Sequence, residues 1–369
     1  MKKIIAKTFV VLTMLVLSLK IIDLMIGIVV SENNSIAKKS HRSLVLREHS
    51  PNLFINIKPG DQYMEGVNTL IQKDYVLRTD SDGFIIGPKD LKRPNEKVSI
   101  IFFGGSSTEC MFVEENKRFP YLVSQTLNIR TLNAGYSGNH SMHSNLALIG
   151  KGVKYKPQFV VFMHAGNDLA TLSKTLSYWN PESPRYLMQN SDESIKSFYD
   201  LARSVKNFII PNIWLRFGYY FQNQVTSIVP DEWAGFRDSK HSYTQIQKII
   251  EKEFSASVKT FVSNSRTWGI EPILMTQFSR FYVDDLEIRN EYERSPQPLT
   301  FEEYVNLFRE SNNIVRNIAK SEGVLLIDLE AEIPARPEFI YDAMHLNSKG
   351  SELVAKIISA KLETAQFLQ

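Results

Sequence analysis

The sequence predicts an α/β fold in which helices cover both faces of a parallel sheet. Short apolar runs alternate with amphipathic stretches after Pro94, each apolar run ends in glycine or polar residues, and no internal repeat interrupts the alternation. Strands that alternate with helices pair in parallel, because each helix carries the chain back across the sheet. In such sheets ligands gather at the carboxyl ends of the strands, so functional residues are expected at those ends.

The individual elements follow from the spacing of the apolar residues. Apolar runs of about five residues bounded by turn residues predict buried strands, and apolar residues three and four apart predict helices with one buried face. The clearest helical stripe lies in 243–268, where apolar residues stand at positions 246, 249, 250, 254, 258, 261 and 262. In chain order the prediction is strand 98–103, helix 120–127, strand 131–134, helix 141–150, strand 158–163, helix 243–268, strand 272–276, helix 301–321, strand 324–329 and helix 348–365.

The N-terminus carries an apolar stretch that is long enough to cross a membrane. Two apolar runs, 9–19 and 21–30, follow three lysines and together exceed the roughly 20 residues that a spanning helix needs. No small-x-small cleavage site follows the first run, which favours an uncleaved signal anchor over 1–33 rather than a cleaved signal peptide. The basic N-terminus indicates a cytoplasmic start and a periplasmic body. Lys20 and Asp23 share a helix face inside this span, where they pair with each other or contact another membrane protein.

Composition and local patterns describe the rest of the chain. The formal net charge of +3 gives no basic footprint for nucleic acid, and no glycine-rich phosphate loop is present. Cys110 is the only cysteine, so no disulfide can form within the chain. Residues 34–96 are predicted to be a polar lead-in segment with short strands, in which 80–83 form a turn between two strand-like runs. Residues 97–369 are predicted to form the main domain, with an aromatic-rich insertion at 170–242 that either lines a cleft or packs on the core or the membrane.

Polar residues at the predicted strand ends form a set that suits acyl transfer. The segment "FFGGSSTEC" places Ser106 on a tight turn directly after a buried strand, where its hydroxyl would point outward. The same turn would also suit a helix cap, and Ser107 is the nearest rival nucleophile. The segment "YDAMHLNSKG" supplies His345 as a base and Asp342, three residues earlier, as the carboxylate that orients the imidazole.

Donors for a developing oxyanion follow the same strands. They are the backbone N–H groups of Ser106 and Gly138 and the side-chain amide of Asn167. Gly138 suits this role because a residue without a Cβ lets a substrate approach its backbone. Nearby histidines lack the carboxylate or cysteine pattern of a metal site, so no metal or cofactor is expected. Those interpreted as pocket or surface residues are His140, His143 and His164.

These blocks resemble the four conserved blocks of the SGNH, or GDSL-like, hydrolases over residues 98–360. Gly105 and Ser107 stand where the name-giving motif has aspartate and leucine. The "GGSST" form, with "RTDSDGF" upstream, is similar to a membrane-anchored branch associated with acyl editing of cell-surface polysaccharides. The resemblance implies a flavodoxin-like three-layer sandwich with a central parallel sheet, preceded here by one N-terminal transmembrane helix.

Three functions fit these expectations. The first is an extracytoplasmic serine esterase that removes a short acyl group, such as acetyl, from a carbohydrate through an acyl-serine intermediate. The second is a polysaccharide O-acetyltransferase that uses the same residues together with an integral membrane acyltransferase as its acyl-donor partner. The third is a non-catalytic glycan-binding protein on the same fold, against which the intact Ser106, Asp342 and His345 argue.

Overall fold

The computed structural model describes residues 41–364, apart from 45, 65–66, 68, 91–95, 192–224, 227–235, 237–239, 282–283 and 295–296. Its contacts divide the chain into two compact units. The smaller unit, Met1–Ser43 with Gln189–Ser194, includes all but one residue of each of the paired strands β1 (His41–Leu44) and β7 (Met188–Ser191). The larger unit, Leu44–Met188 with Ile195–Gln369, contains all the elements described below.

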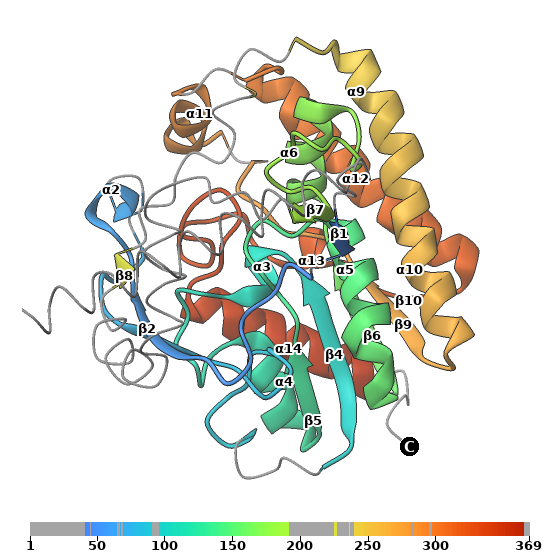
Figure 1. Cartoon of the computed structure of the whole chain (residues 1–369). Coiled ribbons are helices and arrows are strands. Elements are labelled where there is room, and N and C mark those ends of the chain that lie inside the picture. The colour runs from blue at the N-terminus through green and yellow to red at the C-terminus, as the bar shows by residue number, and fades with distance from the viewer. Residues whose placement is uncertain are drawn as a thin grey trace, which may run out of the picture. The chain divides into compact units, whose positions relative to one another are not determined.

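The centre of the larger unit is a five-stranded parallel sheet (Figure 1). Every pairing in it is parallel, and the spatial order is β10-β9-β6-β4-β5. Numbered along the chain and read from the other edge, this is the 2-1-3-4-5 order of flavodoxin-like folds. The predicted parallel α/β sheet is therefore confirmed. Its strands are β4 (Val98–Gly104), β5 (Arg130–Asn133), β6 (Phe159–Met163), β9 (Glu271–Met275) and β10 (Leu325–Ile327).

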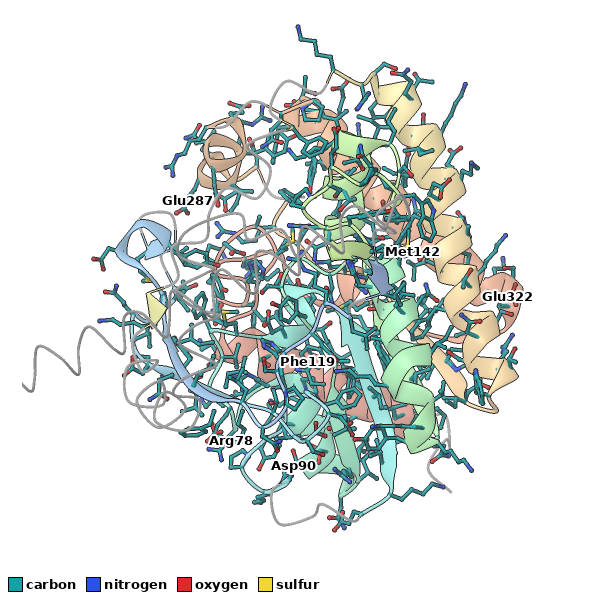
Figure 2. All side chains as sticks on the ribbon, in the orientation of Figure 1. Arg78, Asp90, Phe119, Met142, Glu287 and Glu322 are labelled. Atoms are coloured by element: carbon teal, nitrogen blue, oxygen red, sulfur yellow. The ribbon has the colours of Figure 1, made fainter. Side chains whose placement is uncertain are left out.

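Side chains of the sheet alternate between two hydrophobic cores, because successive residues of a strand point to opposite faces. In β4, Ile101 and Phe103 enter one core, whereas Ile100 and Phe102 enter the other. Phe119, labelled in Figure 2, is fully buried and packs edge-on against Phe102. The first core is covered by α5 (Ser141–Ala147), α6 (Gly166–Thr175), α10 (Ser255–Thr267) and α12 (Phe301–Glu322), and the second by α4 (Phe119–Leu127) and α14 (Ser348–Thr364).

The long helices begin and end where their sequences signal it. At the start of α12, Oγ1 of Thr300 accepts the N–H of Glu303, and the Glu303 carboxylate accepts the N–H of Thr300. The helix ends at Gly323, whose φ of +62° is the left-handed conformation that glycine adopts readily. The predicted helix 243–268 is also present, but a π-helical turn, Ile250–Phe254, separates α9 (Tyr243–Ile249) from α10.

The lead-in segment contributes two strands to a small second sheet, and the 170–242 insertion contributes the third. Strand β2 (Phe54–Lys58) pairs antiparallel with β3 (Tyr75–Arg78) and parallel with β8 (Val225–Thr226). The strand-like run predicted after the turn at 80–83 is not a strand, because Ile85 makes only isolated bridges. One of these bridges joins Ile85 to Asn133 at the end of β5, so the lead-in segment is attached to the edge of the central sheet.

Two sequence predictions fall mainly on residues beyond the described ones. The proposed anchor, 1–33, lies outside them, and so does most of the aromatic insertion. Within the described ranges, no helix combines the length and the apolar character that crossing a bilayer requires. Residues 170–175 complete α6, and Tyr178 beyond them is buried in the first core.

Candidate active site

The turn after β4 exposes one serine and buries the next. Strand β4 ends at Gly104, and helix α3 (Ser106–Glu109) begins with Ser106. A Cβ on Gly105 would lie 2.3 Å from the amide nitrogen of Asn167, so this position needs glycine if Asn167 is to approach the turn. Ser106 is partly exposed, whereas Ser107 is buried. The strand-to-helix turn therefore presents the Ser106 hydroxyl at the carboxyl end of the strand.

Ser106, His345 and Asp342 form a continuous chain of hydrogen bonds. Nε2 of His345 lies 2.7 Å from Oγ of Ser106, and Nδ1 lies 2.6 Å from Oδ2 of Asp342. The backbone N–H groups of Met344 and His345 donate to Oδ1 of Asp342 at 2.9 and 2.8 Å, which orients the carboxylate. The structure thus brings together the three residues singled out in the sequence, in the hydroxyl–imidazole–carboxylate order of acyl-transfer enzymes.

Charge and burial tune the two ionisable members of this chain. Burial raises the pKa of Asp342, but His345 and the two backbone N–H groups outweigh it and hold that pKa below its usual value. Burial lowers the pKa of His345, but the charge and hydrogen bond of Asp342 outweigh it, with Glu109 and Glu291 adding to the effect, so that pKa is raised. Because 25% of the His345 side chain is exposed, a substrate in solution can reach this strengthened base.

Ser107 is held away from the imidazole by two other contacts. Its hydroxyl donates to the carbonyl of Met344 at 2.9 Å and accepts from Nε2 of Gln277 at 3.0 Å. The side-chain oxygen of Gln277 accepts the N–H of Gly166 at 2.9 Å, so this side chain joins the turns after β4, β6 and β9. Sequence analysis missed Gln277, although it is a polar residue that follows the end of a predicted strand.

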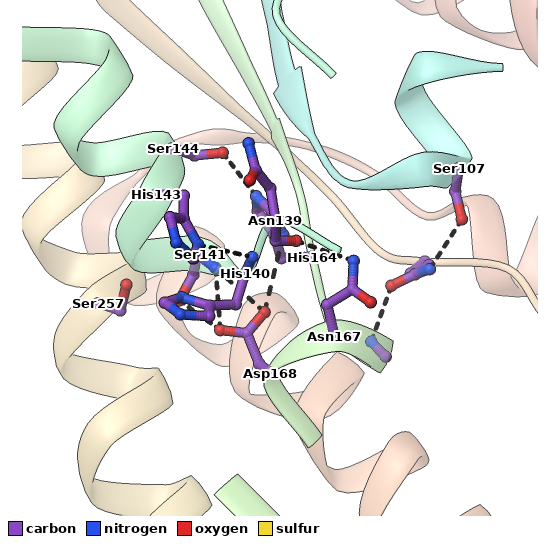
Figure 3. A network of polar contacts seen from close by, with 12 residues as sticks. Ser107, Asn139, His140, Ser141, His143, Ser144, His164, Asn167, Asp168 and Ser257 are labelled. Carbon is purple, nitrogen blue, oxygen red and sulfur yellow. Dashed lines mark hydrogen bonds and ion pairs between the residues drawn. The ribbon is translucent and has the colours of Figure 1, made fainter. Parts of the chain in front are cut away.

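The predicted oxyanion donors lie on neighbouring segments. Nδ2 of Asn167 donates to the carbonyl of Asn139 at 2.8 Å, which ties Asn167 to the loop that contains Gly138 (Figure 3). Oδ1 of Asn167 accepts from Nη1 of Arg185 at 3.0 Å, and this bond fixes which end of the amide faces the Ser106 turn. An amide nitrogen carries two hydrogens, so one remains for an oxyanion. Gly138 has a φ of +79°, a conformation that favours glycine.

The buried carboxylate of Glu109 is hydrogen-bonded to the loop that contains Gly138. Glu109, in α3, is fully buried, and the hydroxyl of Ser137 donates to its Oε2. Its Oε1 lies 2.7 Å from Nε2 of His49, which belongs to the lead-in segment. Nη2 of Arg47 donates to the carbonyl of Ser137 at 3.3 Å. These contacts connect the helix that follows the Ser106 turn, the Gly138 loop and the start of the larger unit, and sequence analysis did not find them.

A second cluster of serine, histidine and aspartate has the composition of a triad but not its connections (Figure 3). Asp168 accepts from the hydroxyl of Ser141 at 2.5 Å and lies 3.7 Å from Nδ1 of His164, whose Nε2 lies 2.7 Å from Oγ of Ser144. Ser141 therefore contacts the carboxylate rather than the imidazole, and no side chain of this cluster is more than 2% exposed. The network holds α5 against α6 and does not reach a substrate.

The neighbouring histidines are interior residues. The rings of His140 and His143 are in contact, with centroids 3.9 Å apart and planes tilted by 46°, and His140, His143 and His164 are all buried. The prediction that they lie in a pocket or on the surface is therefore wrong. Burial lowers the pKa of His143 and of His164 to about 3, which keeps these imidazoles neutral. A neutral ring can be buried inside the protein without a charged partner.

No family model and no curated protein matches the sequence. Among solved structures, a GDSL-like lipase from Bacteroides thetaiotaomicron is 12% identical with a TM-score of 0.42, over 74% of this chain and 90% of the lipase. A lipase/acylhydrolase from Enterococcus faecalis is 14% identical with a TM-score of 0.40, over 72% and 96% of the two chains. An acetylxylan esterase from Geobacillus stearothermophilus is 14% identical with a TM-score of 0.39, over 73% and 94%. At these identities the chemistry of the site rests on the residues of this chain.

Proposed function

We propose that the protein is a serine esterase that removes a short acyl group, such as acetyl, from a carbohydrate through an acyl-serine intermediate. The observation that carries the proposal is the hydrogen-bond chain from Ser106 through His345 to Asp342, with lengths of 2.7 and 2.6 Å. In that order the imidazole can accept the hydroxyl proton while the carboxylate holds its tautomer and stabilises the imidazolium. The substrate class follows from the resemblance of the "GGSST" segment to enzymes that edit polysaccharide acyl groups.

The reaction has two symmetrical halves. Oγ of Ser106 attacks the ester carbonyl as Nε2 of His345 takes its proton, and the carbonyl oxygen becomes an oxyanion. The N–H groups of Ser106 and Gly138 and the amide of Asn167 donate to that oxyanion. The intermediate collapses, the C–O bond to the sugar breaks, and His345 returns the proton to the departing sugar hydroxyl. Water then attacks the acyl-serine in the same way, which releases the free acid and restores Ser106.

A transferase would share every step up to the acyl-serine. It would differ only in the second acceptor, because a sugar hydroxyl rather than water would attack the acyl-enzyme. Lys20 and Asp23, inside the predicted membrane span, are the sequence feature that favours this second function: charged residues at that depth either pair with each other or contact another membrane protein, and the second case would suit an acyl-donor partner. The proposal places the protein in the membrane through its N-terminal span, with the catalytic domain on the periplasmic side.

One experiment tests the proposal and separates the alternatives. The protein is incubated with an aryl acetate and with an acetylated glycan, with and without a glycan acceptor, and free acetate and acetylated acceptor are measured. Free acetate supports the esterase, and acetylated acceptor supports the transferase. Ser106→Ala should lose aryl acetate cleavage by several orders of magnitude, as deletion of a triad nucleophile does. A serine-reactive phosphonate should label the wild type and Ser107→Ala but not Ser106→Ala. If the wild type binds glycan but is not labelled, the third function, a non-catalytic glycan-binding protein, is supported instead.

A further inference from the structure

The carboxylate of Asp342 has a donor that belongs to the lead-in segment. Tyr63 lies in helix α2 (Asp61–Met64), and its hydroxyl donates to Oδ2 of Asp342 at 3.1 Å. The same oxygen lies 2.6 Å from Nδ1 of His345, while Oδ1 accepts two backbone N–H groups. One carboxylate therefore receives four donors, and Tyr63 is the one among them that lies far from Asp342 in the sequence.

The ring of Tyr63 is held where it can keep this contact. It packs at 5.3 Å from the ring of Phe112 and at 6.4 Å from that of Tyr341, measured between centroids. Tyr341 in turn stacks on His345, with centroids 5.7 Å apart and ring planes at 21°. Tyr341 is 3% exposed, so this aromatic column joins the lead-in segment to the imidazole through a packed interior. Movement of α2 would therefore shift the positions of the Asp342 carboxylate and the His345 imidazole.

We propose that Tyr63 is a positioning residue that orients the carboxylate of Asp342 and limits how strongly that carboxylate attracts the proton of His345. A hydrogen bond to Oδ2 draws negative charge away from the imidazole, because two donors share one oxygen. Burial and the nearby Asp342 charge raise the pKa of the Tyr63 hydroxyl far above its usual value. The hydroxyl therefore stays protonated and remains a donor over the whole working range of pH.

Removal of this hydroxyl has a defined direction of effect. Other groups also act on the His345 charge: Asp342 and Glu109, and Glu291 from helix α11 (Leu286–Glu293), all favour the imidazolium. None of them changes in Tyr63→Phe. The carboxylate loses one donor, so its field at His345 strengthens and the pKa of His345 rises. The carboxylate is also held less firmly, so fewer molecules have an aligned imidazole at any instant.

The test uses the full chain, with a matched hydroxyl deletion as the control. Tyr63→Phe should lower kcat for an aryl acetate about tenfold, leave KM unchanged, and move the acid limb of the pH profile to higher pH. Tyr75→Phe should change neither kcat nor the acid limb. Tyr75 belongs to the same aromatic cluster, but its hydroxyl donates to the carbonyl of Ile71 at 2.8 Å rather than to Asp342. Identical behaviour of the two variants would overturn the proposal.

Two further measurements separate this inference from the proposed function. Only the kinetic test of the inference rests on the proposed function. In an Asp342→Ala background, the tenfold loss from Tyr63→Phe should disappear, because the carboxylate that Tyr63 orients is gone and only its contact with the Tyr341 hydroxyl, at 3.3 Å, remains. A full tenfold loss there would show that Tyr63 acts elsewhere. The pKa of His345, measured by NMR on protein with no substrate, should rise in Tyr63→Phe and not in Tyr75→Phe. That titration decides the inference even if the wild type cleaves no ester, whereas absent cleavage would count against the proposed function alone.

Discussion

We expect His345 to set the pH dependence of the proposed reaction. Only the neutral imidazole can accept the proton of Ser106, so kcat/KM should rise with pH and level off above the pKa of His345. Because Asp342 raises that pKa, the acid limb should lie above the value of about 6.5 that an ordinary histidine shows. Initial rates with an aryl acetate from pH 5 to 9 measure it. An acid limb well below 6.5 would contradict the role given to Asp342.

Asp342→Asn tests the same pair from the other side. The amide carries no charge, so the pKa of His345 should fall and the acid limb should move to lower pH. The amide also favours the wrong tautomer of the imidazole, so kcat should fall by about 10⁴. At low pH the lower pKa of His345 would raise the rate, whereas the wrong tautomer would reduce it. The full pH profile is therefore more informative than a rate at one pH. A variant with wild-type kcat would show that Asp342 does not orient the base.

Asn167 is the side-chain donor whose removal is easiest to interpret. Asn167→Ala should lower kcat by roughly 10²–10³ with little change in KM, because the lost hydrogen bond forms fully only in the transition state. Its bonds to Asn139 and Arg185 also disappear, so thermal unfolding should show a loss of about 1 kcal/mol. If Asn167→Ala unfolds the protein while Asn167→Asp stays fully active, the residue is structural.

The elements of the sheet were predictable because each depends on its own sequence. Strand β6 reads as five consecutive apolar residues, and α12 as an amphipathic stripe with its own cap, so both were found within two residues. The predicted strand 324–329 shortens to Leu325–Ile327, because Asp328 already begins the next helix. The turn serine, the base and its carboxylate were found in the same way, since each lies beside a local signal.

Contacts between distant segments could not be predicted. Gln277 reaches Ser107 across 170 residues, and Tyr63 reaches Asp342 across 279 residues. The sequence around either residue does not indicate its partner, because the packing of distant elements determines which side chains meet. The interior location of His140 has the same origin, since its ring packs against Tyr178 and contacts the carbonyl of Arg185, both in a later segment of the chain.

Helix α12 is fixed to the sheet by an ion pair at the end of β10. Nε and Nη2 of Arg316 donate to the two carboxylate oxygens of Asp328 at 2.9 and 2.7 Å, and Thr276 adds a third donor. Burial raises the pKa of Asp328, but Arg316 and Thr276 outweigh it and lower that pKa overall. The stabilisation is therefore present above the unfolded-state pKa of about 3.9 and is lost as pH falls through the lower folded-state value.

Asp328→Asn should accordingly destabilise the protein in a pH-dependent way. We expect a loss of about 1 kcal/mol at pH 7, because the bidentate pair is partly exposed to solvent, and a smaller loss near pH 3. Urea unfolding at the two pH values measures it. Glu332→Gln is the matched control, since Glu332 pairs with Lys361 at 3.3 Å on the surface and should contribute less than 0.5 kcal/mol. Equal effects of the two variants would show that the Arg316–Asp328 pair contributes no more than a surface ion pair, with the contact of Arg316 to Glu330 at 2.6 Å still in place.

Across the molecule, the parallel sheet brings four parts of the candidate site together at the carboxyl ends of its strands. Ser106 follows β4, the Gly138 loop follows β5, Asn167 follows β6 and Gln277 follows β9. These four positions are far apart in the chain, yet all lie at carboxyl ends of adjacent strands, as the fold requires. His345 enters from the loop before α14, and its imidazole reaches the Ser106 hydroxyl, which the turn after β4 already holds in place.

The N-terminal span gives a prediction for the whole protein. If 1–33 is an uncleaved anchor, the full chain should resist extraction with high salt and with carbonate but dissolve in detergent. A variant that begins at Ser35 should be soluble and should keep its activity on an aryl acetate, because the three residues proposed to react lie beyond position 100. Release of the full chain by salt or carbonate would contradict the anchor.

Lys20 and Asp23 decide whether that anchor does more than tether. Replacement of both by leucine removes a pair that is costly in a bilayer, so retention in the membrane should if anything strengthen. If the span contacts an acyl-donor partner through this pair, glycan modification in membranes should fall while aryl acetate cleavage stays unchanged, because the catalytic domain is intact. That split would favour the transferase. If both activities are unchanged, the two residues only satisfy each other, the argument for a membrane partner is lost, and the esterase proposal stands.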